Sequence, residues 1–83
     1  MKVYKYNLKI DEHQVIPMQL NKILSVGLDA KGIPCIWVEV DLASQMLDIN
    51  IYLVYTGEEI HSEMHTYIGT FEYNDLIYHV YTN

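Results

Sequence analysis

The sequence contains no arginine, and its eleven aspartate and glutamate residues outnumber its five lysines, which gives a formal net charge of −6. Nucleic-acid binding draws on clustered lysine and arginine to neutralise phosphates, and arginine is the side chain best shaped to grip phosphate bidentately. The composition therefore argues against direct DNA or RNA binding. The acidity serves solubility in the simplest interpretation, and an acidic surface that competes with nucleic acid for a basic partner is the alternative.

Cysteine is nearly absent. The single Cys35 excludes an intramolecular disulfide and a zinc site of the usual multi-cysteine kind. Its mostly apolar neighbours in GIPCIWVEV suit a buried, reduced thiol of a cytoplasmic protein. Small domains without disulfides or metals often gain burial by self-association, so we expect one domain, 1–83, that forms a homo-oligomer.

Long hydrophobic runs are absent as well. No apolar stretch approaches the ~20 residues that span a bilayer, and the opening MKVYKYNLKI alternates polar and apolar residues where a signal peptide would be continuously apolar. We therefore expect a soluble protein of the cytoplasm without a membrane partner.

What the sequence has in abundance is alternation with period two, which indicates half-buried β-strands. Segment 3–10 alternates in this way, and 49–55 has one wholly apolar and one largely apolar face, which is typical of a central strand. Segment 14–20 contains Pro17, which cannot donate to a ladder, and predicts an edge or irregular segment. The only stretch of helical character, 41–47, is too short to be more than a connection.

Two turns predict hairpins. In 29–32 an aspartate opens a type I turn and Gly32 supplies the left-handed conformation of a G1 bulge. Asn74 and Asp75 both tolerate positive φ and form a two-residue turn.

The second turn sets the register of the last hairpin. On one, core-like face we expect the pairs Tyr73–Leu76, Phe71–Tyr78, Gly69–Val80 and Tyr67–Thr82. On the other, mixed face we expect Glu72–Ile77, Thr70–His79 and Ile68–Tyr81. The fold class is all-β, or mainly β with one short helical turn: a small antiparallel barrel or sandwich of five or six strands built from hairpins.

Histidines offer the only hint of a metal. His61 and His65 in HSEMH would share one face of a helix, but Ser62 breaks the HExxH motif and strands flank the segment. We expect exposed loop histidines and no metal or other cofactor. His79 is expected to form a cross-strand hydrogen bond with Thr70, with a polar contact to a ligand as the alternative.

Catalytic constellations are missing. No basic residue adjoins Cys35 to lower its pKa, the carboxylate pairs 11–12 and 58–59 fall in solvated turns, and no glycine-rich loop is shaped to cradle a phosphate. We expect no enzyme activity.

Aromatic residues are abundant, with eight tyrosines, one tryptophan and one phenylalanine. Tyrosine favours strands without any ligand, yet tyrosine and tryptophan also anchor interfaces. A sheet this small cannot bury eight tyrosines, so one side of it is expected to be an interface with a partner or a second copy; a small-molecule pocket is the alternative. The candidate binding residues are Trp37, Tyr52, Tyr67, Thr70, Tyr78, His79 and Tyr81.

Two stretches, KILSVGLDAKGIPCIWVEVD and HTYIGTFEYNDLIYHVY, resemble a family of small phage- and prophage-encoded proteins of unassigned function. The middle of the chain, 41–66, departs from it, since a glycine-histidine-proline turn of the family is TGEEIH here. The matching residues are Ile23 to Val26, Gly32, Pro34, Cys35, Trp37, Tyr67 to Phe71 and His79.

The resemblance carries no active site. It implies a phage origin, and small phage accessory proteins often bind a host factor or sequester a nucleotide signal of host immunity. We expect a non-catalytic protein of this kind, which inhibits or sequesters a host protein or nucleotide signal in the host cytoplasm. The alternative is a virion assembly protein that acts by self-association, and a metal-dependent enzyme is the third hypothesis.

Overall fold

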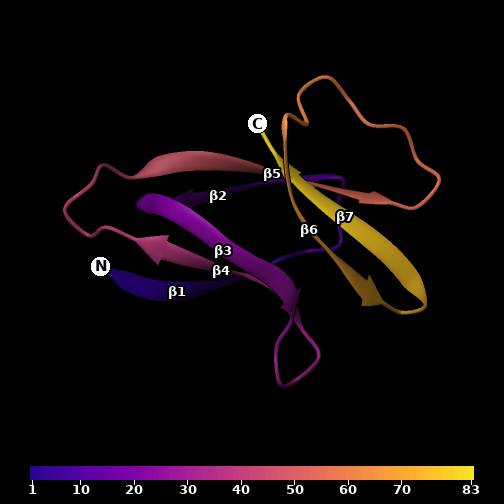
Figure 1. Cartoon of the computed structure of the whole chain (residues 1–83), viewed down its shortest axis with the longest axis horizontal. Coiled ribbons are helices and arrows are strands. Elements are labelled where there is room, and N and C mark those ends of the chain that lie inside the picture. The colour runs from indigo at the N-terminus through magenta and orange to yellow at the C-terminus, as the bar shows by residue number, and fades with distance from the viewer.

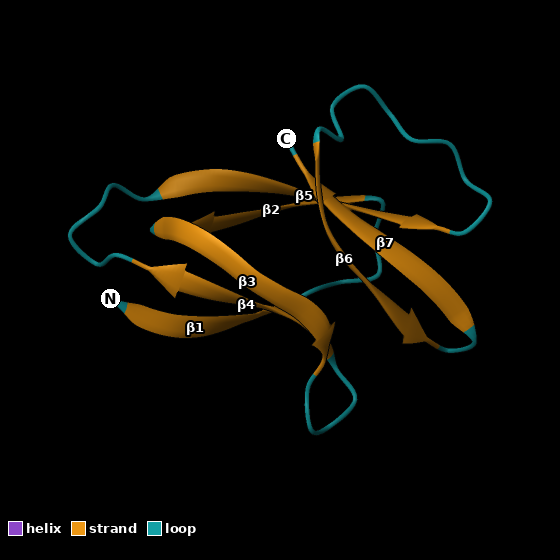
Figure 2. Cartoon of the chain, viewed as in Figure 1, coloured by secondary structure: helices purple, strands orange, loops and turns teal.

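The computed structural model describes residues 1–83, which form seven β-strands and no helix (Figure 2). None of its elements is therefore a helix of the length and apolarity that crossing a bilayer requires. In chain order the strands are β1 (Lys2–Asn7), β2 (His13–Met18), β3 (Leu20–Leu28), β4 (Pro34–Val40), β5 (Leu47–Tyr55), β6 (Thr66–Tyr73) and β7 (Leu76–Thr82).

The strands form two antiparallel sheets (Figure 1). The three-stranded sheet has the order β1-β4-β3 and the four-stranded sheet the order β2-β5-β7-β6. No strand pairing joins the sheets, so four strands remain as edges and the domain is a sandwich. The expected all-β class and the sandwich are confirmed; the barrel is wrong.

The number of strands differs from the expectation. The structure has seven strands where five or six were expected, because 13–18 is a regular strand in spite of Pro17. β2 pairs only with β5, as an edge strand that tolerates proline must. Residues 41–46 contain turns and no helical element, and β5, which begins at Leu47, lies between two neighbours as a central strand.

Both predicted turns are confirmed. Gly32 has a φ of 78°, and its N–H donates to the Asp29 carbonyl at 2.9 Å. Asn74 and Asp75 have φ values of 51° and 65°, the left-handed pair of a two-residue hairpin. Figure 1 shows the β3–β4 turn projecting at the bottom of the view and the β5–β6 loop at the upper right.

The core is a single layer between the sheets. Only 15 of the 83 residues are buried, so every strand position that points away from this layer belongs to the surface unless a loop covers it. Cys35 is buried on the opposite side of β4 from Ile36, as expected of an inert thiol. The core cluster consists of Leu8, Met18, Ile36, Val38, Val40, Ile51, Leu53, Phe71, Tyr78 and Val80.

The β6–β7 register is confirmed from the turn as far as the pair Gly69–Val80 and then departs from the expectation. A β-bulge between Tyr67 and Gly69 takes up one residue, so Tyr67 opposes Tyr81, and the expected pairs Tyr67–Thr82 and Ile68–Tyr81 are wrong. Because side chains alternate with period two, this one-residue shift moves Tyr67 to the other face of the sheet.

Candidate functional site: the outer face of the four-stranded sheet

The outer face of the four-stranded sheet carries a row of four aromatic rings, one from each strand. Tyr52 of β5 opposes Tyr81 of β7, which opposes Tyr67 of β6, and His13 of β2 opposes Tyr52 on the other side. Their neighbours Leu53 and Val80 belong to the core, so the rings point outward. We call His13, Tyr52, Tyr81 and Tyr67 the aromatic row.

The rings of this row contact each other in pairs. The His13 and Tyr52 rings stack with centroids 4.7 Å apart and planes 11° from parallel, and the Tyr67 and Tyr81 rings meet edge to face at 5.5 Å. The amide oxygen of Asn50 accepts a hydrogen bond from His13 Nε2 at 2.7 Å, which fixes the imidazole on Tyr52. The row therefore consists of two ordered ring pairs whose inner members, Tyr52 and Tyr81, are register neighbours on β5 and β7.

A chain of four polar side chains borders the aromatic row. The Tyr67 hydroxyl lies 2.5 Å from Thr70 Oγ1, which lies 3.0 Å from His79 Nδ1. The other ring nitrogen of His79, Nε2, lies 3.0 Å from the Thr56 hydroxyl. The expected hydrogen bond between Thr70 and His79 is confirmed. We call Tyr67, Thr70, His79 and Thr56 the polar chain; it holds Tyr67 and His79 in fixed orientations.

Charge is divided unevenly between the two halves of the sequence. Residues 1–40 have five lysines and four acidic residues, a charge of +1, whereas 41–83 have no lysine and seven acidic residues, a charge of −7. Three of the four strands behind the aromatic row come from the second part, and β2 has no Asp, Glu or Lys. Asp48 and Glu72 lie on the outer face at its two ends, in register with Pro17 and Ile77.

The candidate residues from the sequence divide between three places. Tyr52, Tyr67, Thr70, His79 and Tyr81 come together on this outer face. The other two, Trp37 and Tyr78, lie elsewhere.

Trp37 lies on β4, on the outer face of the three-stranded sheet, and does not join the tyrosines. Tyr78 belongs to the core and stacks on Phe71 with centroids 5.6 Å apart. It also lines a cavity of about 300 Å³ beside Ile10 and Glu58.

Three residues of the face escaped the sequence analysis: His13, Asn50 and Thr56. His13 begins a strand that Pro17 made look irregular, and the pairing of that strand with β5 is what brings the imidazole to Tyr52. The available signal was the period of two in this strand. Met18 is buried, so positions 13, 15 and 17 lie together on the opposite face, away from the core.

Other groups with chemical potential lie outside this face. His61 and His65 are exposed in the β5–β6 loop, and no group of three or more His, Cys, Asp or Glu side chains is arranged to hold a metal ion. Burial, followed by the charge of Asp29, raises the pKa of the Cys35 thiol. This thiol therefore stays protonated and is a poor nucleophile.

The whole chain, residues 1–83, matches the family described as Domain of unknown function (DUF7352), and the protein belongs to that family. Membership of a family of unassigned function was expected, and the family assigns no role to any residue. No curated protein and no solved structure matches the chain.

Proposed function

We propose that this protein is a non-catalytic binding protein that captures a basic protein partner on the outer face of its four-stranded sheet. The observation that carries the proposal is the aromatic row, which spans all four strands of this sheet; three of these strands lie in residues 41–83, which have seven acidic residues and no lysine. Tyrosine rings combine a large apolar area with a polar tip and are enriched at the centres of interfaces.

A partner rich in arginine fits this chemistry. A guanidinium group stacks on the face of an aromatic ring and is attracted by the ring quadrupole, while Asp48 and Glu72, at the two ends of the same face, add charge complementarity to a basic partner. Tyr67 is 55% exposed and Tyr52 and Tyr81 are half-buried, so that the rings present area to a partner while their edges are supported by neighbours.

The hydrogen bonds of the face lower the cost of binding. His13 is tied to Asn50, and Tyr67 is tied through Thr70 to His79. Side chains that are already ordered lose less rotamer entropy when a partner docks, and binding to a preorganised surface is correspondingly tighter.

The biological role that we propose follows the resemblance to phage-encoded proteins. The partner is a host protein in the host cytoplasm, and capture inhibits it in antagonism of host defence. Virion assembly through self-association is the alternative, and it requires two copies to dock through a common surface. Two acidic faces repel each other, so a homo-oligomer would use a surface other than the aromatic row.

The test is an NMR titration of the full chain with a short arginine-rich peptide, with lysine and glutamate peptides of equal length as comparisons. We expect the largest shifts at His13, Tyr52, Tyr67 and Tyr81, tighter binding of the arginine peptide than of the lysine peptide, and weaker binding as salt rises. Binding of the glutamate peptide, or shifts spread evenly over all acidic residues, would overturn the proposal.

A matched pair of variants separates the face from general acidity. Tyr67→Ala removes an exposed ring of the row, and Tyr4→Ala removes a tyrosine that is 40% exposed on β1 of the other sheet. We expect Tyr67→Ala to lower the affinity for the arginine peptide roughly tenfold, which is the usual effect of removing an interface anchor residue. Tyr4→Ala should leave this affinity unchanged. Equal effects of the two variants would contradict the proposal.

A further inference from the structure

A second concave site lies on the opposite side of the sandwich. The outer face of the three-stranded sheet and the β3–β4 turn line an open cavity of about 510 Å³. This volume is within the roughly 300–1,000 Å³ that is typical of small-molecule sites. Its lining includes Trp37, two of the five lysines, Lys5 and Lys31, and the amide of Asn7, and it shares no residue with the aromatic row.

The strand register places the indole beside small side chains. Trp37 lies between Lys5 of β1 and Ser25 of β3, and the next row of the same face is Asn7, Cys35 and Gly27. A Cβ added to Gly27 would lie 3.8 Å from Trp37 Cζ3, which places the edge of the indole over this glycine. The half-buried indole lines the hollow together with the apolar side chains of Leu28, Ala30 and Ile33.

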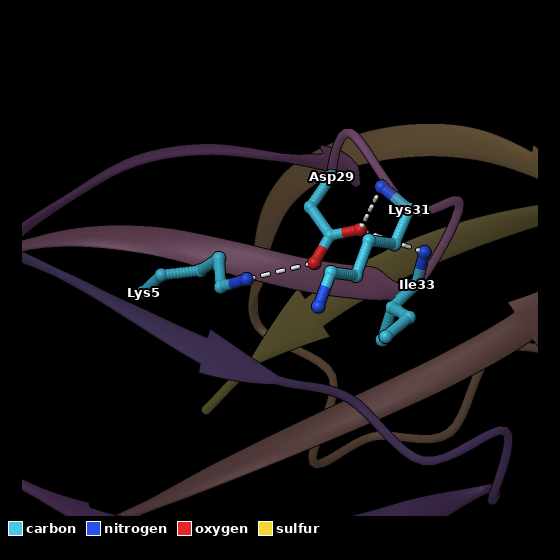
Figure 3. Close-up of polar contacts among 4 residues, drawn as sticks. All are labelled: Lys5, Asp29, Lys31 and Ile33. Carbon is cyan, nitrogen blue, oxygen red and sulfur yellow. Dashed lines mark hydrogen bonds and ion pairs between the residues drawn. The ribbon is translucent and has the colours of Figure 1, made fainter.

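Asp29 organises the charged rim of the cavity (Figure 3). Its carboxylate accepts hydrogen bonds from Lys5 Nζ at 2.7 Å and from the backbone N–H groups of Lys31 at 2.9 Å and Ile33 at 3.0 Å. These three donors engage both oxygens of the carboxylate. Its charge is therefore compensated from within the protein.

The Lys31 ammonium remains available for a ligand. Lys5–Asp29 is the only ion pair in the chain, so Lys31 Nζ has no carboxylate partner. Figure 3 shows the Lys31 side chain running back past the Asp29 carboxylate toward Lys5. Two ammonium groups and one carboxylate leave the rim with one positive charge, in a protein whose net charge is −6.

We propose that this cavity binds a small planar anion, with an aromatic ring on the Trp37 indole and a phosphate or carboxylate group on the Lys31 ammonium. Stacking of a ring on tryptophan and charge-assisted hydrogen bonds from ammonium groups are the two interactions that the lining offers. Asn7 adds an amide at the edge that can donate to, or accept from, polar atoms of the ring. Nucleotides and aromatic carboxylates share this chemistry.

Trp37 is the only tryptophan, so its emission and its indole N–H resonance report on the cavity alone. The probes are adenosine monophosphate for the nucleotide class, benzoate for the aromatic carboxylates, and adenosine and inorganic phosphate as the two halves of the first. We expect either adenosine monophosphate or benzoate to shift the indole N–H resonance saturably, depending on which ligand class the cavity binds. Adenosine and inorganic phosphate should each bind more weakly than adenosine monophosphate.

Two lysine variants test the anion contact. Lys31→Gln removes the unpaired ammonium at the rim, and Lys22→Gln makes the same change in charge beside a different cavity. We expect Lys31→Gln to lower the affinity about fivefold, the effect of losing one exposed ion pair. Lys22→Gln should leave the affinity unchanged. Adenosine binding as tightly as the monophosphate, equal effects of the two variants, or no saturable shift with any probe would overturn the proposal.

The outcome is independent of the proposed function. Tyr67→Ala lies on the other face of the sandwich and leaves the Trp37 response unchanged, whereas Lys31→Gln leaves the arginine peptide bound at the aromatic row at least as tightly. Either site can therefore fail in its own assay while the other is retained.

Discussion

Gly69 of β6 and Val26 of β3 face each other across the sandwich so closely that a Cβ on Gly69 would lie inside van der Waals distance of Val26 Cγ1. β3 and β6 are edge strands of different sheets, and they are the two strands through which the backbones of the sheets approach each other. The β-bulge that turns Tyr67 outward begins directly beside Gly69. This contact therefore connects the packing of the sheets to the geometry of the aromatic row.

Gly69→Ala is expected to lower the free energy of unfolding by about 1–3 kcal/mol, the usual cost of overpacking a filled site. Val26 is β-branched, which restricts its χ1 rotamers, so it cannot easily move aside. Urea denaturation measures the effect. The control is Gly27→Ala, whose added Cβ would make only an ordinary contact at 3.8 Å with Trp37.

Adding Val26→Ala to Gly69→Ala tests the cause of this loss. We expect the double variant to be more stable than the sum of the two single changes predicts, because the second change removes the atom that the first one meets. Strict additivity of the two single variants would contradict the contact.

Thr70→Val is expected to interrupt the polar chain at its centre. It removes the hydroxyl that lies between Tyr67 and His79, and the stability should fall by about 0.5–1.5 kcal/mol, the net value of a hydrogen bond. The nitrogen chemical shifts of His79 should change as well, because Nδ1 loses its partner while Nε2 keeps Thr56. The control is Thr66→Val, at an exposed β6 position without a side-chain hydrogen bond. If the His79 chemical shifts of Thr70→Val matched those of the wild type, this would argue against the polar chain.

The Asp29 network predicts a loss of stability in acid. The hydrogen bond from Lys5, followed by that from the Ile33 N–H, lowers the pKa of Asp29 from 3.8 to about 2. The pKa of Asp29 is lower in the folded state than in the unfolded state. The network therefore contributes its full stabilisation above the unfolded-state pKa, and this stabilisation is lost as the pH falls through the folded-state pKa. Urea midpoints should therefore drop between pH 4 and pH 2, the window set by these two values.

Asp29→Asn should remove this part of the pH dependence, whereas Asp48→Asn, at an exposed position on the other sheet, should keep it. A carbon-detected titration of the Asp29 carboxyl gives the pKa directly. A midpoint near 3.8 would contradict the network.

The last hairpin should respond to the chirality of its turn. Asp75 has a φ of 65°, a conformation that glycine adopts freely and a β-branched residue strongly resists. We expect Asp75→Gly to keep or raise the stability, since Asn-Gly is the preferred type I′ turn, and Asp75→Val to lower it by about 1–3 kcal/mol. Thermal denaturation of the two variants measures the difference, and equal melting temperatures would contradict the assigned turn.

Much of the fold follows from local rules. The alternation of side chains predicted a strand from Val3, the central strand and the edge strand with Pro17, because each depends only on which residues share a face. The first strand is shorter than the expected 3–10, since β1 ends at Asn7, and most of its residues are exposed rather than half-buried. Gly32 and the pair Asn74 and Asp75 predicted the two hairpins, because positive φ is restricted to a few residue types. The pair Thr70–His79 followed from counting outward from the second turn.

The composition of the candidate site was decided by contacts between distant segments. Pairing of β2 with β5 brought His13 to Tyr52, and the placement of β4 in the other sheet separated Trp37 from the tyrosines. The bulge beside Gly69 moved Tyr67 onto the outer face.

By itself, the sequence determined that this chain forms strands, where it turns, and that more aromatic rings exist than one small core can cover. Only the tertiary structure decided which rings meet, because a one-residue bulge or the choice of a neighbouring strand reverses the face of a side chain without changing any local pattern. The close approach of Gly69 to Val26 is such a contact: it joins residues that are distant in the chain, and the sheets rather than the local sequence set its distance.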